Sequence, residues 1–271
     1  MTSGMVNVRS ASHCYGDDDD GILALSNVSL DIGEVEFVAV VGPSGCGKST
    51  LLRLIAGLIL ASSGSVAVGG KRVTGPRSDV GLVFQAPTLL PWANVLANVI
   101  FPLKMVGEYG RGSDDHAREL LALAGLDGFE TRMPDQLSGG MQQRVAICRG
   151  LIREPKVLLM DEPFAALDAL TREEMGRHLL NLWTLKPKAI VFVTHSVPEA
   201  VMLSDRVVVM SARPGRVIDE IPIDLPRPRT FEIEASDEFQ SAAKRIRGHI
   251  YGSSAARQAS QALVGGVASN A

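Results

Sequence analysis

The chain has 271 residues, of which 46% are apolar and 21% are charged, with a formal charge of −3 and a pI near 6.0. This composition is typical of a globular protein with a sizeable core, and the length suits one large domain with attached subdomains. The slightly acidic balance argues against a protein that binds nucleic acid or an anionic membrane through a basic surface.

Hydropathy and cysteine usage narrow the expected location. No apolar run approaches the roughly 18 residues that a membrane-spanning helix needs. The first residues lack the basic and apolar segments of a secretory signal. Cys14, Cys46 and Cys148 are odd in number and widely spaced, which suits neither a disulfide framework nor a zinc site. We therefore expect a cytoplasmic protein with free thiols.

Residues 5–34 alternate short apolar and polar segments around an acidic interruption, a pattern typical of an antiparallel hairpin. The interruption contains four consecutive aspartates, residues 17–20. Such a cluster could bind a cation, but mutual repulsion favours a solvated hairpin tip. No chemistry is assigned to it.

Four later runs are apolar almost throughout, and they predict parallel strands buried on both faces. They cover Glu36–Val41, Lys156–Met160, Ala189–Thr194 and Arg206–Met210. Helical patterns separate several of these runs, as the crossovers of an α/β sheet require.

A helical pattern also fills residues 87–154, which predicts an inserted helical subdomain. Ser113 is the expected N-cap of one helix there, and Gly125 its end. The last twenty residues, 252–271, are dominated by Ala, Ser, Gly and Gln and predict a weakly ordered tail.

A glycine-rich stretch after the first apolar run matches the Walker A phosphate-binding loop, because it follows a strand and opens a helix predicted at residues 51–58. Its glycines let backbone N–H groups face the phosphates, and the helix N-terminus adds about half a positive charge. Lys48 would neutralise the β and γ phosphates of ATP, and Ser49 would bind Mg²⁺. A chance glycine turn fits this context less well. The stretch comprises Gly42, Pro43, Ser44, Gly45, Cys46, Gly47, Lys48, Ser49 and Thr50.

The second apolar run ends in two carboxylates, which belong at the sheet edge where ligands bind. Asp161 suits the Walker B role of holding Mg²⁺ through water, and Glu162 that of orienting or deprotonating the attacking water. An Asp-Glu pair at a strand end is often only a helix cap, but the phosphate loop favours the catalytic interpretation.

A second anion-binding helix N-terminus is predicted at Leu137–Arg144, where Ser138, Gly139 and Gly140 precede an amphipathic helix. Its apolar face runs through Met141, Val145, Cys148 and Ile152. With this stretch the sequence resembles the ABC ATPase family, whose signature motif reads the same way. The resemblance covers roughly residues 5–230.

The resemblance implies that two copies of the chain pack head to tail. Each ATP would lie between the phosphate loop of one copy and the signature residues of the other, Ser138, Gly139, Gly140 and Gln142. A two-fold interface of this kind explains why one polypeptide carries both half-sites.

Further positions match the family in order. Tyr15 resembles the aromatic residue that stacks on adenine, although a strand tyrosine can be mere packing. Gln85 resembles the glutamine that senses Mg²⁺ and water and links to the transmembrane partner. Asp168 resembles part of the loop that crosses the dimer, and His195 the switch histidine that contacts the γ-phosphate.

Two positions depart from the family pattern. Ala166 stands where many relatives have Ser, and the resemblance implies that one cross-dimer hydrogen bond of the family would then be missing. Ser196 stands where many have Asp, which alters the surroundings of the histidine.

The resemblance also indicates which group of ABC ATPases the chain is similar to. The absence of spanning helices implies a separate membrane permease, and short motifs around Trp92, Arg213 and Pro226 look like importers of nitrate, sulfonates, taurine or pyrimidine precursors. A substrate-binding protein would then be an indirect partner, and the chain would lie peripherally on the cytoplasmic face of the membrane. The alternative is a non-transport ABC ATPase that acts on nucleic acid or ribosomes, but the chain lacks the long coiled-coil insertion or second motif set of those proteins.

The resemblance implies an α/β fold of the P-loop NTPase (RecA-like) type. It has a mostly parallel sheet, an N-terminal antiparallel β subdomain and an inserted helical subdomain. The expected ATPase domain covers residues 5–230, with the insertion at about 87–154, and residues 231–271 form a C-terminal helix and tail.

Overall fold

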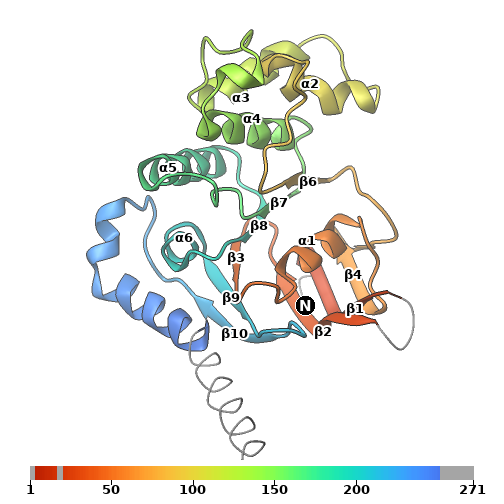
Figure 1. The fold of residues 1–271 in the computed structure, drawn as a ribbon, viewed down its shortest axis with the longest axis vertical. Coiled ribbons are helices and arrows are strands. Elements are labelled where there is room, and N and C mark those ends of the chain that lie inside the picture. Colours follow the sequence, from red (N-terminus) through yellow and green to blue (C-terminus); the bar gives the residue numbers. More distant parts are fainter. Residues whose placement is uncertain (1–3, 17–20, 251–271) are drawn as a thin grey trace, which may run out of the picture.

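A six-stranded sheet forms the centre of the described part of the chain, with the order β10-β9-β3-β8-β7-β6 (Figure 1). The computed structural model describes residues 4–16 and 21–250. All neighbours are parallel except β10, which pairs antiparallel to β9. The four predicted strands are confirmed and lie side by side. The bounds are β3 Phe37–Val41, β6 Val80–Val83, β7 Val157–Asp161, β8 Ala189–Val193, β9 Arg206–Met210 and β10 Val217–Pro222.

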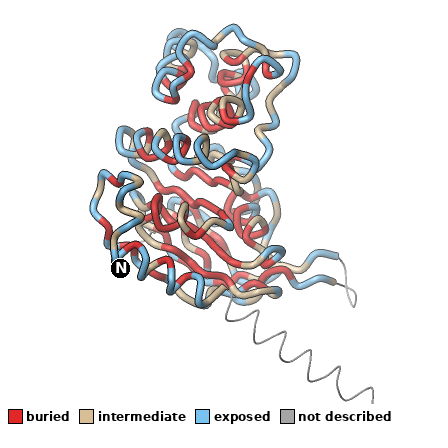
Figure 2. Tube along the Cα trace, turned by 60° about the vertical axis from the view of Figure 1, so that its left-hand side comes forward, coloured by how far each residue is buried: buried red, intermediate tan, exposed pale blue. Residues whose placement is uncertain are grey.

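The continuous apolarity of these strands has a direct structural cause. Along β3, Phe37, Ala39 and Val41 belong to one apolar core, whereas Val38 and Val40 belong to another. Successive side chains of a strand point to opposite faces, so a strand covered on both sides needs apolar residues at every position. Figure 2 shows the buried positions concentrated in this part of the molecule.

A smaller antiparallel sheet, with the order β2-β1-β4-β5, packs through α1 against the central sheet. The predicted hairpin is confirmed as β1 and β2, but β4 and β5 were not predicted, because they are short and lack an apolar run. The aspartates at 17–20 lie outside the described residues. The bounds are β1 Val6–Tyr15, β2 Ile22–Ile32, β4 Ser63–Val68, β5 Lys71–Arg72 and α1 Lys48–Ala56.

The helices α2, α3 and α4 form a separate layer beyond the edge of the central sheet, at the top of Figure 1. They fall inside the range predicted for a helical insertion, and Leu120 and Leu121 of α3 are buried. The N-cap of α3 is Gly112, so the prediction of Ser113 was wrong by one residue. The bounds are α2 Val95–Met105, α3 Ser113–Leu123, a 3₁₀ turn at Pro134–Gln136 and α4 Gly139–Leu151.

The C-terminal part of the described chain packs on the central core. Phe239, Ala243 and Ile246, within helical residues 237–250, are buried in it. Arg229 is buried, and it donates hydrogen bonds to the carbonyls of Val201 at 2.9 Å and Ser204 at 2.7 Å, at the end of α6. The predicted tail at 252–271 lies outside the described residues. The remaining bounds are α5 Ala169–Leu185, α6 Val197–Leu203 and a 3₁₀ segment, η3, at Phe231–Ala235.

None of the helices within residues 4–16 and 21–250 is both long and apolar enough to cross a membrane.

Candidate active site

The glycine-rich stretch forms a tight loop between β3 and α1. Gly45 and Gly47 have φ values of 72° and 99°, which lie in a region that residues with a Cβ rarely adopt. A Cβ at Gly47 would also lie 2.6 Å from a methyl group of Leu25. The helix begins at Lys48 and ends at Ala56, earlier than the predicted 51–58, because Gly57 caps it with a φ of 74°.

Lys48 is buried inside this loop with neutral partners. Its side chain is 6% exposed, and its Nζ donates to the carbonyl oxygens of Gly42 at 2.8 Å and Pro43 at 3.1 Å. A buried ammonium is costly unless an anion compensates it, and carbonyl groups supply only partial charge. The loop therefore fits a polyphosphate anion.

Ser49 and Asp161 meet at the carboxyl end of the central strands. The Ser49 hydroxyl donates to Oδ1 of Asp161 at 2.9 Å. Burial raises the pKa of Asp161, and the neighbouring Glu162 raises it further, against the lowering effect of the Ser49 hydrogen bond. Two hard oxygen ligands with a partly desolvated carboxylate fit a divalent cation such as Mg²⁺. The described residues contain no group of three or more His, Cys, Asp or Glu arranged for a metal.

The fold brings Glu162 and His195 together from neighbouring strands. Because β7 and β8 run parallel, their carboxyl ends lie side by side, and Glu162 Oε2 is 3.2 Å from Nδ1 of His195. Glu162 has a φ of 46°, an uncommon conformation for a residue with a side chain, and its N–H donates to the carbonyl of Val193 at 2.9 Å. Strained backbone of this kind is often found at catalytic positions.

A hollow of about 400 Å³ lies over the phosphate loop and includes Tyr15 and Glu162 in its wall. The Tyr15 hydroxyl is 3.3 Å from Oγ1 of Thr50, so the ring leans over the start of α1 and remains 37% exposed. Arg213 also lines this hollow and donates to the carbonyl of Gly45 at 3.2 Å. Sequence reasoning used Arg213 only to choose a branch of the family and missed its place at the site.

Gln85 lies at the same sheet edge but outside the hollow. It follows β6, whose Val83 pairs with Met160 beside Asp161, and its side chain is exposed. The helix α4 holds its segment: Gln143 donates to the Phe84 carbonyl at 3.2 Å, and Arg149 donates to the carbonyl of Pro87 at 2.7 Å. Gln143 was also missed, although it stands within the signature stretch.

The signature residues lie far from the phosphate loop of their own chain. Ser138 caps α4 by accepting from the N–H of Met141 at 3.3 Å, and Gln142 donates to the carbonyl of Pro134 at 2.9 Å. Figure 1 places α4 in the helical layer and α1 beside the small sheet. The fold therefore separates the two anion-binding helix ends.

Asp168 is close to the signature within the chain. A Cβ on Gly140 would lie 2.5 Å from Cγ2 of Thr171, so the start of α4 packs directly against the start of α5. Asp168 is the N-cap of α5 and accepts from the N–H and hydroxyl of Thr171 at 3.0 and 2.7 Å. At Gly139, by contrast, an added Cβ would meet no atom within 4 Å, so packing does not require glycine there.

The two departures from the family pattern have different consequences. Ser196 is the N-cap of α6 and accepts from the N–H of Glu199 at 3.4 Å, so it fills the capping role that aspartate also performs well. The structure gives no specific partner that explains alanine at Ala166.

Comparison with known proteins identifies the family. A family profile described as ABC transporter matches residues 25–165. An ABC transporter ATP-binding protein of Methanocaldococcus jannaschii is 49% identical over 241 residues, 89% of each chain. The aliphatic sulfonates import ATP-binding protein of Bacillus cereus is 42% identical over 89% of this chain and 94% of its own. The taurine import ATP-binding protein of Rhizobium johnstonii is 46% identical over 87% and 92%.

A solved structure agrees with the fold. The dimeric post-hydrolysis state of an ATP-binding cassette bound to ADP and Pi superposes with a TM-score of 0.71 and 34% identity, over 82% of this chain and 100% of the other. The α/β P-loop NTPase fold expected from the sequence is confirmed. The phosphate loop, the paired carboxylates and these relatives together show that the chain belongs to the ABC transporter family, as an ATP-binding subunit that hydrolyses ATP.

Proposed function

We propose that this chain powers a membrane importer as a homodimer that binds two ATP molecules between its protomers. The observation that carries the proposal is that one chain holds two anion-binding helix N-termini, those of α1 and α4, apart from each other (Figure 1). In a two-fold dimer, the phosphate loop of one protomer can face Ser138, Gly139, Gly140 and Gln142 of the other. The dimeric cassette among the similar structures supports this arrangement.

The site residues divide the hydrolytic work. Lys48 neutralises phosphate charge, Tyr15 stacks on the adenine, and Asp168 contacts the partner protomer. Glu162 accepts a proton from the water whose oxygen attacks the γ-phosphorus as the bond to the bridging oxygen breaks. His195, 3.2 Å from Glu162, contacts the γ-phosphate. Catalysis here consists of positioning and charge neutralisation rather than covalent chemistry.

The proposed metal ligands are Ser49 directly and Asp161 through water. When bound, Mg²⁺ would neutralise charge on the phosphate oxygens. Gln85, exposed and outside the hollow, is proposed to reach this centre only when its segment moves. The hydrogen bonds from Gln143 and Arg149 to that segment support such a movement with the helical layer.

A separate permease is the proposed membrane partner. A hollow of about 500 Å³ lies beside the Gln85 segment, between β6 and helices α2 and α4. Phe84, Met105 and Val106 line it with exposed fractions of 44%, 67% and 51%. Exposed apolar side chains gathered in one groove are typical of a protein docking surface. We assign it to a cytoplasmic helix of the permease, which places the chain peripherally on that face of the membrane; a substrate-binding protein would deliver the cargo.

The cargo class is proposed from the relatives. Two of them are named for import of aliphatic sulfonates and of taurine, so we propose a small sulfonate as cargo. Deleting the gene should abolish growth on an alkanesulfonate or taurine as sole sulfur source while growth on sulfate persists. Normal growth on both sulfonates, with lost growth on nitrate, would reassign the cargo.

Complementation between two inactive variants tests the shared site. In Lys48→Ala every phosphate loop is defective, and in Ser138→Arg every signature is defective. A mixed dimer contains one intact site, because the first protomer supplies Ser138 and the second supplies Lys48. Each variant alone should hydrolyse almost no ATP, and the mixture should recover activity. Full activity of Ser138→Arg alone, or no recovery on mixing, would refute the dimer.

A further inference from the structure

A chain of polar contacts joins the His195 segment to the loop that precedes α5. It begins at Thr194, which is 2% exposed and whose Oγ1 accepts from the N–H of Ser196 at 3.0 Å. The same hydroxyl donates to Oε2 of Glu199 at 2.6 Å. The Thr194 side chain thus binds the backbone of Ser196 on the other side of His195, and the carboxylate of Glu199 binds the same hydroxyl.

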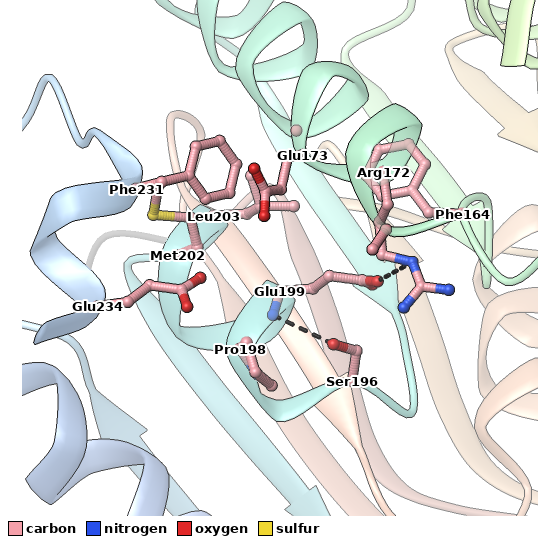
Figure 3. Close-up of a pocket in the computed structure, with 12 residues that line it drawn as sticks. Phe164, Arg172, Glu173, Ser196, Pro198, Glu199, Met202, Leu203, Phe231 and Glu234 are labelled. Atoms are coloured by element: carbon pink, nitrogen blue, oxygen red, sulfur yellow. Dashed lines mark hydrogen bonds and ion pairs between the residues drawn. The ribbon is translucent and has the colours of Figure 1, made fainter. Parts of the chain in front are cut away.

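The chain of contacts continues across to α5. Glu199 Oε1 forms an ion pair with Nε of Arg172 at 3.3 Å, drawn in Figure 3. The same guanidinium donates from its Nη2 to the carbonyl of Leu167 at 3.0 Å. Leu167 is followed by Asp168, the N-cap of α5. The planar fork of Arg172 therefore connects a carboxylate on α6 with a backbone carbonyl in the loop Phe164–Asp168.

The burial of these groups makes the connection stiff. The side chain of Glu199 is 13% exposed and that of Arg172 is 32% exposed. Burial raises the pKa of Glu199, while the Thr194 hydrogen bond and Arg172 lower it. A partly desolvated ion pair with additional hydrogen bonds holds its geometry better than a surface pair does.

The surroundings show that this pair is distinct from its acidic neighbours. Arg172 and Glu199 stand on one wall of a pocket between α5, α6 and η3, whose other members include Glu173, Phe231 and Glu234 (Figure 3). Glu173 is exposed on α5, one residue from Arg172, and burial and Glu173 raise the pKa of Glu234. Neither glutamate forms part of the chain from Thr194 to Leu167.

We propose that Arg172 and Glu199 are positioning residues that link the His195 switch of a protomer to its Phe164–Asp168 loop, which meets the partner protomer. The inference rests on the proposed roles of His195 and Asp168. The link makes the placement of His195 at one ATP depend on the loop that reaches the other ATP. Neither residue touches the nucleotide; both act through the segments they hold.

Steady-state hydrolysis by Glu199→Gln and Arg172→Lys tests the link. Lysine keeps the positive charge beside Glu199, but its single ammonium cannot also span to the Leu167 carbonyl as the guanidinium does. Each variant should lower kcat about tenfold, with the KM for ATP within about twofold of the wild-type value, because the phosphate loop is untouched. The double variant should be no slower than either single variant, because both break one link.

Two matched controls lie on the same helix as Arg172. Glu173→Gln and Arg177→Lys make the same chemical changes on α5 without touching the link, and both should keep the wild-type kcat. The melting temperature of each variant separates folding from turnover. Arg172→Lys should melt near the wild type and still turn over slowly, whereas a purely structural ion pair would be rescued by lysine.

The outcomes separate this link from the proposed function. Wild-type kcat in Arg172→Lys, or additive losses in the double variant, overturns the link while complementation between protomers still succeeds. Failed complementation instead removes the two-chain site on which the link depends.

Discussion

At the scale of single residues, the site consists of charges that the fold places among unusual neighbours. Lys48 is buried against two carbonyl oxygens, and Asp161 is partly desolvated beside Glu162. Burial of such groups costs stability, which is recovered when a ligand of opposite charge arrives. The energetic cost of burying these charges is thus a source of affinity for the nucleotide.

Lys48→Ala should weaken ATP binding by at least about tenfold, because a desolvated charge-assisted contact with phosphate is lost. Titration calorimetry with a non-hydrolysable ATP analogue measures the affinity. Lys71→Ala, an exposed lysine on β5, is the matched control and should bind as the wild type does. Unchanged affinity in Lys48→Ala would remove this lysine from the site.

Glu162→Gln keeps the shape of the side chain but cannot accept the proton of the attacking water. Hydrolysis should fall by about 100-fold or more, while ATP binding persists and a closed dimer accumulates. Gel filtration in ATP and Mg²⁺ should show that dimer. The control Glu34→Gln changes a glutamate that precedes β3, at the end of the sheet away from the site, and should behave as the wild type. Monomers alone with undiminished hydrolysis would contradict the assignment.

At the scale of elements, the start of α4 is fitted to the start of α5. Gly140 leaves no room for a Cβ beside Thr171, whereas Gly139 has open space. The signature and the Asp168 loop are therefore packed against each other within a protomer, and both face the partner in the proposed dimer.

Gly140→Ala should lower the free energy of unfolding by about 1–3 kcal/mol, because the added methyl group overpacks this contact. Urea denaturation measures the change, and Gly139→Ala is the control one residue away. Equal stability of the two variants would show that the contact between α4 and α5 can accommodate the added methyl group without a loss of stability.

At the scale of the whole molecule, the chain separates a nucleotide hollow from an apolar groove and joins them through the Gln85 segment. Gln143 and Arg149 of α4 hold that segment, so a displacement of the helical layer displaces the groove as well. This arrangement is suited to converting closure around ATP into motion of a docked partner.

Met105→Glu places a charge in the groove and should abolish co-purification of the permease from membranes. Val35→Glu, at another well-exposed apolar position near the start of β3, should retain it. Membrane-bound complexes isolated through a tag on this chain provide the measurement. Full recovery of the permease with Met105→Glu would place the docking surface elsewhere.

The sequence determined those parts of the molecule whose signal is local. Continuous apolar runs specify strands buried on both faces, and glycines followed by Lys48 and Ser49 specify a loop whose backbone geometry few other residues allow. Four of the six central strands, β3, β7, β8 and β9, and the phosphate loop were predicted for these reasons, and the hairpin at residues 5–34 was predicted from its alternating pattern. The short strands β4, β5, β6 and β10 were not predicted, because their pairing partners, rather than their own composition, decide their conformation.

Only the tertiary structure decided which distant residues meet. Parallel pairing of β7 with β8 brings Glu162 to His195, and the return of the chain after β9 brings Arg213 to the phosphate loop. The contact between Arg172 and Glu199 likewise could not be predicted from the sequence, because arginine and glutamate residues are common on amphipathic surface helices. Side-chain chemistry is encoded in the residue, but distance and burial are properties of the packed chain, and they determine what that chemistry can do.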